Sequence, residues 1–384
     1  MQQLTYVKKR ILEWRDAAEP TLRSPKEAIV RPFVAARCDL DSLPLFHNVT
    51  APIKLGLAVH YLDPLVRDML GNDPFKGPYP FGHECVAQVI ECGGDVKNVR
   101  RGDKVIVPWA VSCGHCFNCD HDLTSKCTNS GTNSGDMLFS AYGFGSAMGP
   151  WGGAISDKLR VPYADAMLVA VPAGVDPVAI ASASDNMPDG WRTVAPHLQR
   201  YPGAPVLIVG GVARSIGLYA AGLAVALGSS RVDYLDSSPA RLEIAQSLGA
   251  NPIEVQGGFG WYRKHAPRRS GPYLISVDAS ASIAGLNYAL RSLAPGGICT
   301  GVGGYFMRKA PLSLMQMFAN SSTLHIGVAH HRADLPALLA FLKTGKFKPE
   351  RVTTLVAAWE DAPQAFLERT TKVVVKRDPL RAQA

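Results

Sequence analysis

Four cysteines, Cys113, Cys116, Cys119 and Cys127, lie close together in the spacing C-x-x-C-x-x-C-x7-C. Four thiolates gathered by short loops form a closed tetrahedral shell, which is the arrangement of a structural zinc site. An iron–sulfur cluster requires a different spacing of the fourth cysteine, and a redox C-x-x-C needs only two cysteines. We therefore predict that residues 108–130 form a lobe around one structural zinc ion.

A second set of metal-ligand types is spread along the chain. Cys38 ends a probable strand, His83 and Glu84 follow a glycine, and Asp185 lies much further along. One sulfur, one imidazole and carboxylate oxygens suit a zinc ion that keeps one position open for substrate. Each signal alone is weak, because a histidine beside a glutamate is more often an ordinary surface or core pair. Their order along the chain carries the prediction.

The elements that must position these residues change character along the chain. The first third reads as short strands separated by Gly, Pro and Asp, for example 28–34, 86–91 and 104–107, which is typical of an all-β lobe. From residue 204 onward, short apolar strands alternate with helices, which predicts βαβ units and a parallel sheet. The expected strands are 206–209, 232–235, 273–277, 298–302 and 324–328, and the expected helices are 215–227, 239–248 and 283–293.

The turn after the first of these strands has the features of a dinucleotide site. Such a turn places backbone N–H groups and the positive end of a helix against a pyrophosphate. The turn does not follow the regular G-x-G-x-x-G pattern. Only Gly217 matches a glycine of that pattern, its last, without a gap, and the loop is a residue or two longer than the pattern. The predicted cofactor contacts are Gly210, Gly211, Arg214, Ser215, Ile216 and Gly217 in the turn, together with Arg241 beyond the next strand.

Asp236 ends the strand that follows this turn, 19 residues after Gly217. An acid at that place hydrogen-bonds the ribose 2′-OH of a dinucleotide and repels a 2′-phosphate, which favours NAD over NADP. The alternative is that Asp236 caps the helix that begins at Pro239, a role that Ser237 or Ser238 could fill equally well.

Composition excludes several classes of protein. The chain has 384 residues, of which 47% are apolar and 19% charged, enough for a large core and unlike a disordered chain. No apolar run reaches the ~18–20 residues of a membrane span, and the first residues lack the pattern of a signal peptide. The net charge of +8 comes from dispersed basic residues, so we expect neither a nucleic-acid nor a membrane partner. From the missing span and signal peptide we expect a soluble cytoplasmic protein, and in a reducing cytosol its eight cysteines are not expected to form disulfides.

The order and spacing of these motifs resemble the zinc-dependent alcohol dehydrogenases of the medium-chain dehydrogenase/reductase superfamily, nearest to the formaldehyde, sorbitol and threonine dehydrogenase-like branches. The resemblance runs from the Cys38 segment through Gly82-His83-Glu84 and the four-cysteine lobe to the tail 372–378. It implies an α/β protein of two domains. A GroES-like, β-rich catalytic domain occupies 1–185, a doubly wound Rossmann domain binds the cofactor at 186–330, and residues 331–384 complete the catalytic domain.

The resemblance also implies roles for individual residues. Cys38, His83 and Asp185 bind a catalytic zinc, and Glu84 is either a fourth ligand or a carboxylate that exchanges with substrate water. Asp41 orients the zinc-bound imidazole, a role with a clear physical basis. Further cofactor contacts implied by the family are Asp189 near the nicotinamide, Val302 beside the dinucleotide and Arg332 at the pyrophosphate.

Two departures from the family concern the proton and the substrate. Leu40 stands where the family usually has a serine or threonine that relays the alcohol proton, which leaves Glu84, His47, Asp189 or water for that task. The segment 43–79 is longer than usual and rich in apolar residues. We expect it to reshape the substrate pocket, to form a lid, or to pack on the surface or on another subunit.

The activity implied by the resemblance is hydride transfer between a small-molecule alcohol and NAD, with two zinc ions per chain. Three alternatives remain: an NADPH-dependent aldehyde or ketone reductase, an aldehyde dismutase with bound NAD, and a non-catalytic binding protein. The resemblance further implies a homodimer or homotetramer, with 303–328 as a contact segment.

Overall fold

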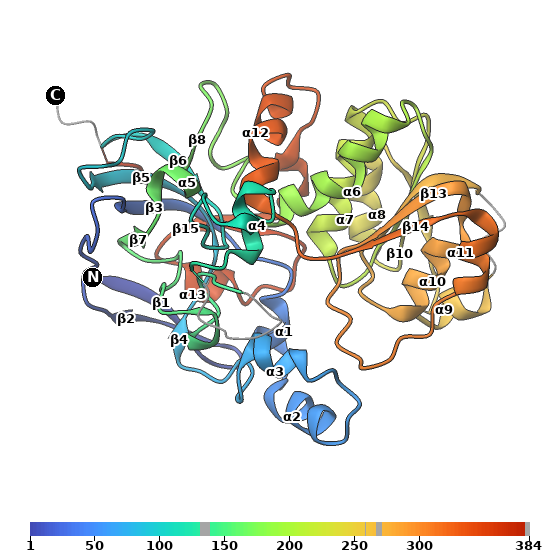
Figure 1. The fold of residues 1–384 in the computed structure, drawn as a ribbon, viewed down its shortest axis with the longest axis horizontal. Coiled ribbons are helices and arrows are strands. Elements are labelled where there is room, and N and C mark those ends of the chain that lie inside the picture. Colours follow the sequence, from blue (N-terminus) through green and yellow to red (C-terminus); the bar gives the residue numbers. More distant parts are fainter. Residues whose placement is uncertain (131–138, 258, 266–270, 381–384) are drawn as a thin grey trace. The chain divides into compact units, whose positions relative to one another are not determined.

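The computed structural model describes residues 1–130, 139–257, 259–265 and 271–380, and the chain divides into two compact units (Figure 1). The first unit consists of Met1–Asp185, His330–Lys343 and Thr353–Ala384, and the second of Asn186–Ala329 and Thr344–Val352. The segment 344–352, which the sequence assigned to the first domain, therefore lies in the second unit. The reason is Phe347, which is buried and contacts the Tyr219 ring at a centroid distance of 6.5 Å.

A seven-stranded sheet forms the frame of the first unit. The strand order is β15-β16-β3-β5-β6-β8, with β7 paired to β3. The strands are β3 (Ala28–Ala36), β5 (Glu84–Cys92), β6 (Lys104–Val107), β7 (Leu159–Val161), β8 (Val169–Ala170), β15 (Leu355–Ala358) and β16 (Val373–Lys376). Strand β3 is buried at all but one position, so β-branched and small apolar residues fill both faces of this part of the sheet. A second sheet, β2-β1-β4, consists of β1 (Gln2–Lys8), β2 (Ile11–Asp16) and β4 (Tyr79–Pro80).

Short helices complete the first unit. The long segment between Cys38 and His83 folds into α1 (Ser42–Phe46), α2 (Thr50–Ala58) and α3 (Leu65–Leu70), and it is anchored by the buried Leu45 and Phe46. The remaining helices are α4 (Phe117–Asp120), α5 (Ala164–Met167), α12 (His331–Leu342), α13 (Ala362–Ala365) and the 3-10 turns η1 (Thr124–Lys126) and η2 (Ser146–Met148).

The second unit is a six-stranded parallel sheet with the order β11-β10-β9-β12-β13-β14. Numbered within the unit this order is 3-2-1-4-5-6, which confirms the expected Rossmann architecture. The strands are β9 (Val206–Val209), β10 (Val232–Asp236), β11 (Asn251–Glu254), β12 (Tyr273–Asp278), β13 (Leu293–Gly301) and β14 (Thr323–Ile326). The helices are α6 (Asn186–Arg200), α7 (Arg214–Ala226), α8 (Pro239–Ser247), α9 (Phe259–Lys264), α10 (Ile283–Arg291) and α11 (Leu314–Asn320), with the 3-10 turn η3 (Pro349–Val352).

Two elements that the sequence analysis did not predict, β11 and α11, have no buried residue, so neither shows the pattern of a core element. Among the described residues, no helix has the length and apolar character that crossing a bilayer requires.

Candidate active site

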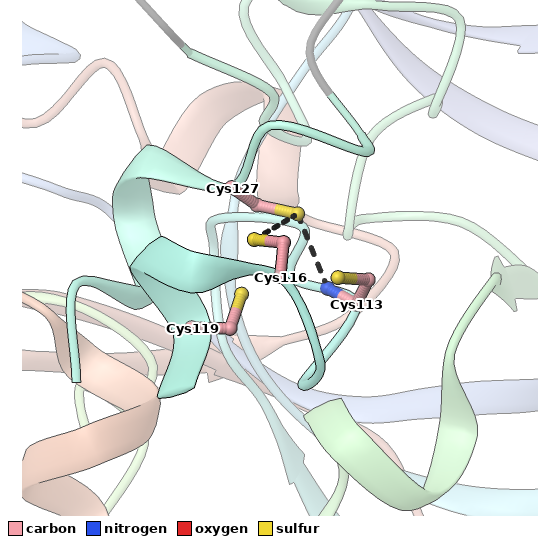
Figure 2. Close-up of side chains that lie close together, drawn as sticks. All are labelled: Cys113, Cys116, Cys119 and Cys127. Carbon is pink, nitrogen blue, oxygen red and sulfur yellow. Dashed lines mark hydrogen bonds between the residues drawn. The ribbon is translucent and has the colours of Figure 1, made fainter. Parts of the chain in front are cut away.

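The four clustered cysteines form a small, buried group in the first unit. Figure 2 shows their side chains lying close together around one point, with Cys119 on α4 and Cys127 just after η1. Their sulfur atoms all lie within 4.8 Å of one another, and Cys116 Sγ is 4.0 Å from Cys127 Sγ. Sulfur ligands of tetrahedral zinc are about 3.8 Å apart, given a Zn–S distance of about 2.3 Å. The cluster therefore has the size and chemistry of a structural zinc site.

Hydrogen-bond donors surround these sulfur atoms. The backbone N–H of Cys113 donates to Cys127 Sγ at 3.3 Å, and Asn129 Nδ2 donates to Cys113 Sγ at 3.4 Å. Burial raises the pKa of the Cys116 thiol, but hydrogen bonds from Thr128 outweigh burial and lower that pKa to about 5. Donors of this kind favour thiolates, which are the form of cysteine that binds zinc.

The second cluster brings together Cys38, His83 and Asp185, all in the first unit. Strands β3 and β5 are antiparallel neighbours in which Ala36 pairs with Glu84. Cys38 comes two residues after the end of β3 and His83 comes directly before β5, so both lie at the same end of this strand pair, where their ligand atoms are close together. These placements follow from the pairing register of two central strands.

Asp185 is held near Cys38 and His83 by hydrogen bonds of the preceding residue, Ser184. Ser184 Oγ accepts a hydrogen bond from the Cys85 backbone N–H at 3.0 Å and donates to the Cys85 carbonyl at 2.8 Å. The Ser184 carbonyl also accepts from the Trp109 backbone N–H at 3.2 Å. These three bonds fix the chain in front of α6 against β5, so the carboxylate of Asp185 is held beside His83.

The geometry of this second cluster fits a zinc ion. The three ligand atoms lie within 4.8 Å of one another, and His83 Nε2 is 3.2 Å from Asp185 Oδ2. Nitrogen and oxygen ligands of tetrahedral zinc are about 3.3 Å apart, given metal–ligand distances of about 2.0–2.1 Å. All three side chains are buried. Three donors in place leave one coordination position of a tetrahedral site open, as catalytic zinc sites do.

The electrostatics of the cluster also suit a cation. Burial lowers the pKa of His83, but the neighbouring Asp41 and Asp185 outweigh burial and raise that pKa to about 9. Burial together with Asp185 and Asp41 raises the pKa of the Cys38 thiol well above its usual range. The shift of His83 reflects the negative charge of the two carboxylates, and that of Cys38 reflects burial first and these carboxylates second; a bound divalent cation offsets such negative charge.

Asp41 lies behind His83, on the side away from Asp185. Its Oδ1 is 3.8 Å from His83 Nδ1, and its Oδ2 accepts a hydrogen bond from the Cys38 backbone N–H at 3.1 Å. At 3.8 Å this contact is an ion-pair distance and not a hydrogen bond, and His83 Nδ1 has no hydrogen-bond partner among the described residues. This position is the one expected for a carboxylate that orients a metal-binding imidazole.

Glu84 lies outside the ligand cluster, although it follows His83 directly. Its Oε2 accepts hydrogen bonds from Lys372 Nζ at 2.7 Å and from Ser182 Oγ at 2.9 Å. Glu84 and Lys372 are both fully buried, and Lys372 Nζ also donates to the Arg37 carbonyl at 2.9 Å. In this arrangement Glu84 forms a buried ion pair beneath the cluster.

Three residues around the cluster, His331, Trp109 and Phe144, were missed by the sequence analysis. His331, the first residue of α12, lies with Nε2 3.0 Å from Asp185 Oδ1, and Trp109 Nε1 donates to His331 Nδ1 at 2.5 Å. The Phe144 ring stacks on the imidazole of His83 at a centroid distance of 4.5 Å. No spacing rule links these residues to Cys38 or His83, so only the tertiary structure reveals them.

The residues considered for proton transfer differ in access to water. Leu40 is 36% exposed, and it has no group that exchanges a proton. Glu84 is fully buried in its ion pair, and Asp189 Oδ1 accepts a hydrogen bond from Arg192 Nε at 2.6 Å. His47 is exposed, so it is the candidate side chain that reaches solvent.

The turn between β9 and α7 lies at the carboxyl end of the parallel sheet, where Rossmann domains bind dinucleotides. A Cβ at Gly211 would lie 2.7 Å from Ser280 Cα, and one at Gly217 would lie 3.1 Å from Ala279 Cβ. Gly211 therefore requires glycine because the backbone after β12 approaches it closely, and Gly217 lies in tight contact with the Ala279 side chain. Val302 packs against a small cluster of Ala213, Ile216 and Ala279 in the same region.

Asp236 lies at the end of β10 and makes four hydrogen bonds. Oδ1 accepts from the Ser238 backbone N–H at 2.9 Å and from Arg241 Nη2 at 2.6 Å. Oδ2 accepts from Tyr234 OH at 2.9 Å and from Arg241 Nε at 2.7 Å. Beside it is a cavity of about 240 Å³ lined by Gly210, Gly211, Val212, Arg214, Ser237, Arg241, Val255 and Tyr262. The structure thus brings the predicted turn glycines, Arg214 and Arg241 to one cavity.

The other predicted cofactor residues are spread over both units. Arg332 is in the first unit, where its Nε donates to the Ala166 carbonyl at 2.6 Å. Ser215 is in the second unit, where its Oγ donates to Asn186 Oδ1 at 3.0 Å. Asp189 is also in the second unit, on α6.

Two protein families match the chain in the regions that carry these sites. The alcohol dehydrogenase GroES-like domain family matches residues 25–173, and the zinc-binding dehydrogenase family matches residues 215–344. A probable zinc-binding alcohol dehydrogenase of Mycobacterium tuberculosis is 28% identical over 318 residues, covering 83% of this chain and 76% of the relative. A glutathione-independent formaldehyde dehydrogenase of Bacillus subtilis is 36% identical over 179 residues, covering 46% of this chain and 42% of the relative.

The solved structure of an alcohol dehydrogenase from Thermus sp. ATN1 superimposes with a TM-score of 0.77 at 26% identity, covering 98% of this chain and 99% of the other. Together with the two matched families and the two metal-ligand clusters, this similarity extends over both units. The chain therefore belongs to the zinc-dependent alcohol dehydrogenases of the medium-chain dehydrogenase/reductase superfamily, enzymes that act on a CH–OH group of a small molecule with a nicotinamide dinucleotide.

Proposed function

We propose that the chain interconverts an alcohol and its aldehyde or ketone with NAD, at a zinc ion held by Cys38, His83 and Asp185. The observation that carries the proposal is the convergence of these three ligand atoms within 4.8 Å in a buried site. Zinc there supplies a Lewis acid for the substrate oxygen, and the nicotinamide accepts the hydride.

The side chains of the first unit prepare this site. Asp41 orients the His83 imidazole from behind, and the buried pair of Glu84 and Lys372 supports the backbone at His83 from below. The rings of Phe144 and Trp109 cover His83, with centroid distances of 4.5 and 6.2 Å. Aromatic cover excludes water, which strengthens electrostatic interactions inside the site. The second zinc, in the four-cysteine lobe, has no open position and serves the fold.

The proposal is tested by counting metal and measuring turnover in two cysteine variants. The wild-type protein should contain two zinc ions per chain and should reduce NAD in the presence of some member of a panel of alcohols. Cys38→Ala should contain one zinc ion and lose turnover, while it still binds NADH, because the dinucleotide turn lies in the other unit. Cys92→Ala, which belongs to neither cluster, is the matched control. Two zinc ions and full turnover in Cys38→Ala would refute the proposal.

The preference for NAD is supported by the position of Asp236 at the end of β10. The NADP alternative is favoured by one observation, namely that Arg214 and Arg241 line the adjacent cavity. In wild type we expect NAD to bind more tightly than NADP. Asp236→Asn should lower the affinity for NAD by about 10-fold or more, which is the loss expected for a hydrogen bond to a charged group. The same change should raise the affinity for NADP, since Arg241 loses its charged partner. Tighter binding of NADP than NAD by wild type would reverse the assignment.

We further propose that two copies of the chain associate through β14 and α11. Strand β14 is the outer strand of its sheet, and Ile326 on it is 52% exposed. Helix α11 exposes Leu314, Met315 and Phe318. An exposed apolar helix that directly precedes an outer strand in the chain offers, together with the edge of that strand, a surface that a second copy can cover by pairing strand with strand. We place the protein in the cytoplasm because all eight cysteines are free.

A further inference from the structure

Asp185 lies between two histidines that approach different oxygen atoms of its carboxylate. His83 Nε2 is 3.2 Å from Oδ2, and His331 Nε2 is 3.0 Å from Oδ1. His331 is 2% exposed, so this contact is removed from bulk water. One carboxylate oxygen thus faces the ligand cluster, and the other faces His331.

The proton on His331 is placed by Trp109. The indole N–H of Trp109 donates to His331 Nδ1 at 2.5 Å, and an indole nitrogen can only donate. His331 Nδ1 is therefore an acceptor, and a neutral ring with that tautomer carries its proton on Nε2. The nitrogen that faces Asp185 then carries a proton and lies 3.0 Å from Oδ1, an ion-pair distance without the geometry of a regular hydrogen bond among the described residues.

Both histidines at the start of α12 are attached to the part of the chain that bears the four-cysteine lobe. The Ser125 backbone N–H, in η1 just before Cys127, donates to His330 Nδ1 at 3.3 Å. Trp109 lies four residues before Cys113, at the other end of the lobe. The first turn of α12 is therefore held from both ends of the lobe, within one unit.

We propose that His331 is a positioning residue for the catalytic metal site: it holds Asp185 Oδ1, so that Oδ2 points to the metal, and Trp109 and the four-cysteine lobe hold His331 in turn. This inference rests on the function proposed above. Groups that bind the free oxygen of a ligating carboxylate fix its orientation, and their loss typically lowers metal affinity by about 10–100-fold. The four-cysteine lobe thereby contributes to the second site as well as to its own stability.

The experiment is a titration of the full-length protein with Co²⁺ after selective removal of the catalytic metal. Competition with a chelator gives the affinity of the site, and the visible absorption of Co²⁺ reports its coordination. His331→Leu removes the Nε2–H group and should lower the affinity for Co²⁺ by about 10–100-fold. It should also alter the visible spectrum of bound Co²⁺. His331→Gln keeps an N–H donor and should lie closer to wild type. Trp109→Phe removes the indole N–H together with the five-membered ring and keeps an aromatic side chain, and it should fall between them. His121→Leu, an exposed histidine, is the matched control.

The four-cysteine site provides the folding control, because each variant should retain its structural zinc. Wild-type affinity and an unchanged spectrum in His331→Leu would overturn the inference. If His331→Leu fails to fold, Trp109→Phe decides, and wild-type affinity in that variant overturns the inference equally. If the wild-type protein and Cys38→Ala contain the same number of metal ions, the site at Cys38 holds no metal. The proposed function then fails, and this inference fails with it.

Discussion

At the scale of single residues, Glu84 could act as a metal ligand or as a structural residue, because it follows the ligand His83 but pairs with Lys372. Its Oε2 is 2.7 Å from Lys372 Nζ, and both side chains are fully buried. Removal of one partner from a buried ion pair leaves an uncompensated charge and typically costs about 3–5 kcal/mol. Glu84 is therefore tied to stability more directly than to metal binding.

The corresponding prediction concerns Glu84→Gln. The variant should keep two zinc ions per chain, while its free energy of unfolding in urea falls by about 3 kcal/mol or more. Glu13→Gln breaks an exposed pair with Arg15 and should change stability by less than about 1 kcal/mol. A Glu84→Gln protein with a single zinc ion would instead make Glu84 a ligand.

Asp278, at the end of β12, gives a prediction for pH. Burial raises the pKa of this carboxyl to about 6, although Ser280 and Tyr305 donate hydrogen bonds to it. Its folded pKa thus lies above the ordinary value of about 3.9, so the stability it contributes is present below pH 4 and is lost as pH rises through 6. The part of the free energy of unfolding that depends on this carboxyl is at most about 3 kcal/mol.

Asp278→Asn removes this dependence. The difference in unfolding free energy, variant minus wild type, should increase between pH 4 and pH 7 by up to about 3 kcal/mol. Parallel urea titrations of both proteins at each pH measure it. Loss of zinc in acid cancels in the difference, because the metal clusters lie in the other unit. A constant difference over that range would contradict the assigned pKa.

Residue types and spacing predicted part of the site. The four cysteines carry their own signature, and Cys38, His83 and Asp185 are ligand types in a recognisable order. His331 and Lys372 were not predicted, because each meets the cluster from the last quarter of the chain with no fixed spacing to a ligand. Long-range packing, which a single sequence does not encode locally, places them there.

At the scale of elements, the parallel sheet was predictable because its strands are short, apolar and regularly followed by helices. Strand β9 matches the expected 206–209, and α7 matches the expected 215–227 within one residue at each end. The helices α1, α2 and α3 were not predicted within 43–79. Their apolar residues are distributed without a clear helical stripe, and Leu55, for example, is 64% exposed.

The segment 344–352 is joined to the second unit by the buried Phe347, by the buried Val352 and by a hydrogen bond from Arg351 to the Ser247 carbonyl. Phe347 is 4% exposed, and a Cβ at Gly222 would lie 2.5 Å from its ring. Glycine on α7 thus makes room for Phe347, which explains why this stretch leaves the first unit.

We predict that Phe347→Ala destabilises the second unit by about 3–5 kcal/mol, the usual cost of a buried phenylalanine. The change should appear as a lower urea midpoint for the loss of NADH binding, since the dinucleotide turn precedes α7. Phe117→Ala removes a ring that is 72% exposed and should shift the midpoint little. Equal midpoints for the two variants would show that Phe347 does not anchor the segment.

At the scale of the whole molecule, the question is what covers the apolar surface of β14 and α11. Leu314, Met315 and Phe318 are 66%, 74% and 79% exposed, and no residue of α11 is buried. Four large apolar side chains in one region, counting Ile326, are more than scattered surface residues require. A net charge of +8 disfavours close approach of two copies, so apolar burial has to supply the association energy.

Phe318→Glu tests this surface, because it places a carboxylate where the proposed interface excludes water. Sedimentation should give a dimer or a larger even assembly for wild type and a smaller species for Phe318→Glu at the same concentration. Phe117→Glu, on the four-cysteine lobe, carries the same change of charge at an exposed ring and should sediment as wild type does. Both variants should keep two zinc ions per chain, since Phe318 lies in the unit without metal ligands. A wild type that remains monomeric at high concentration would exclude the interface.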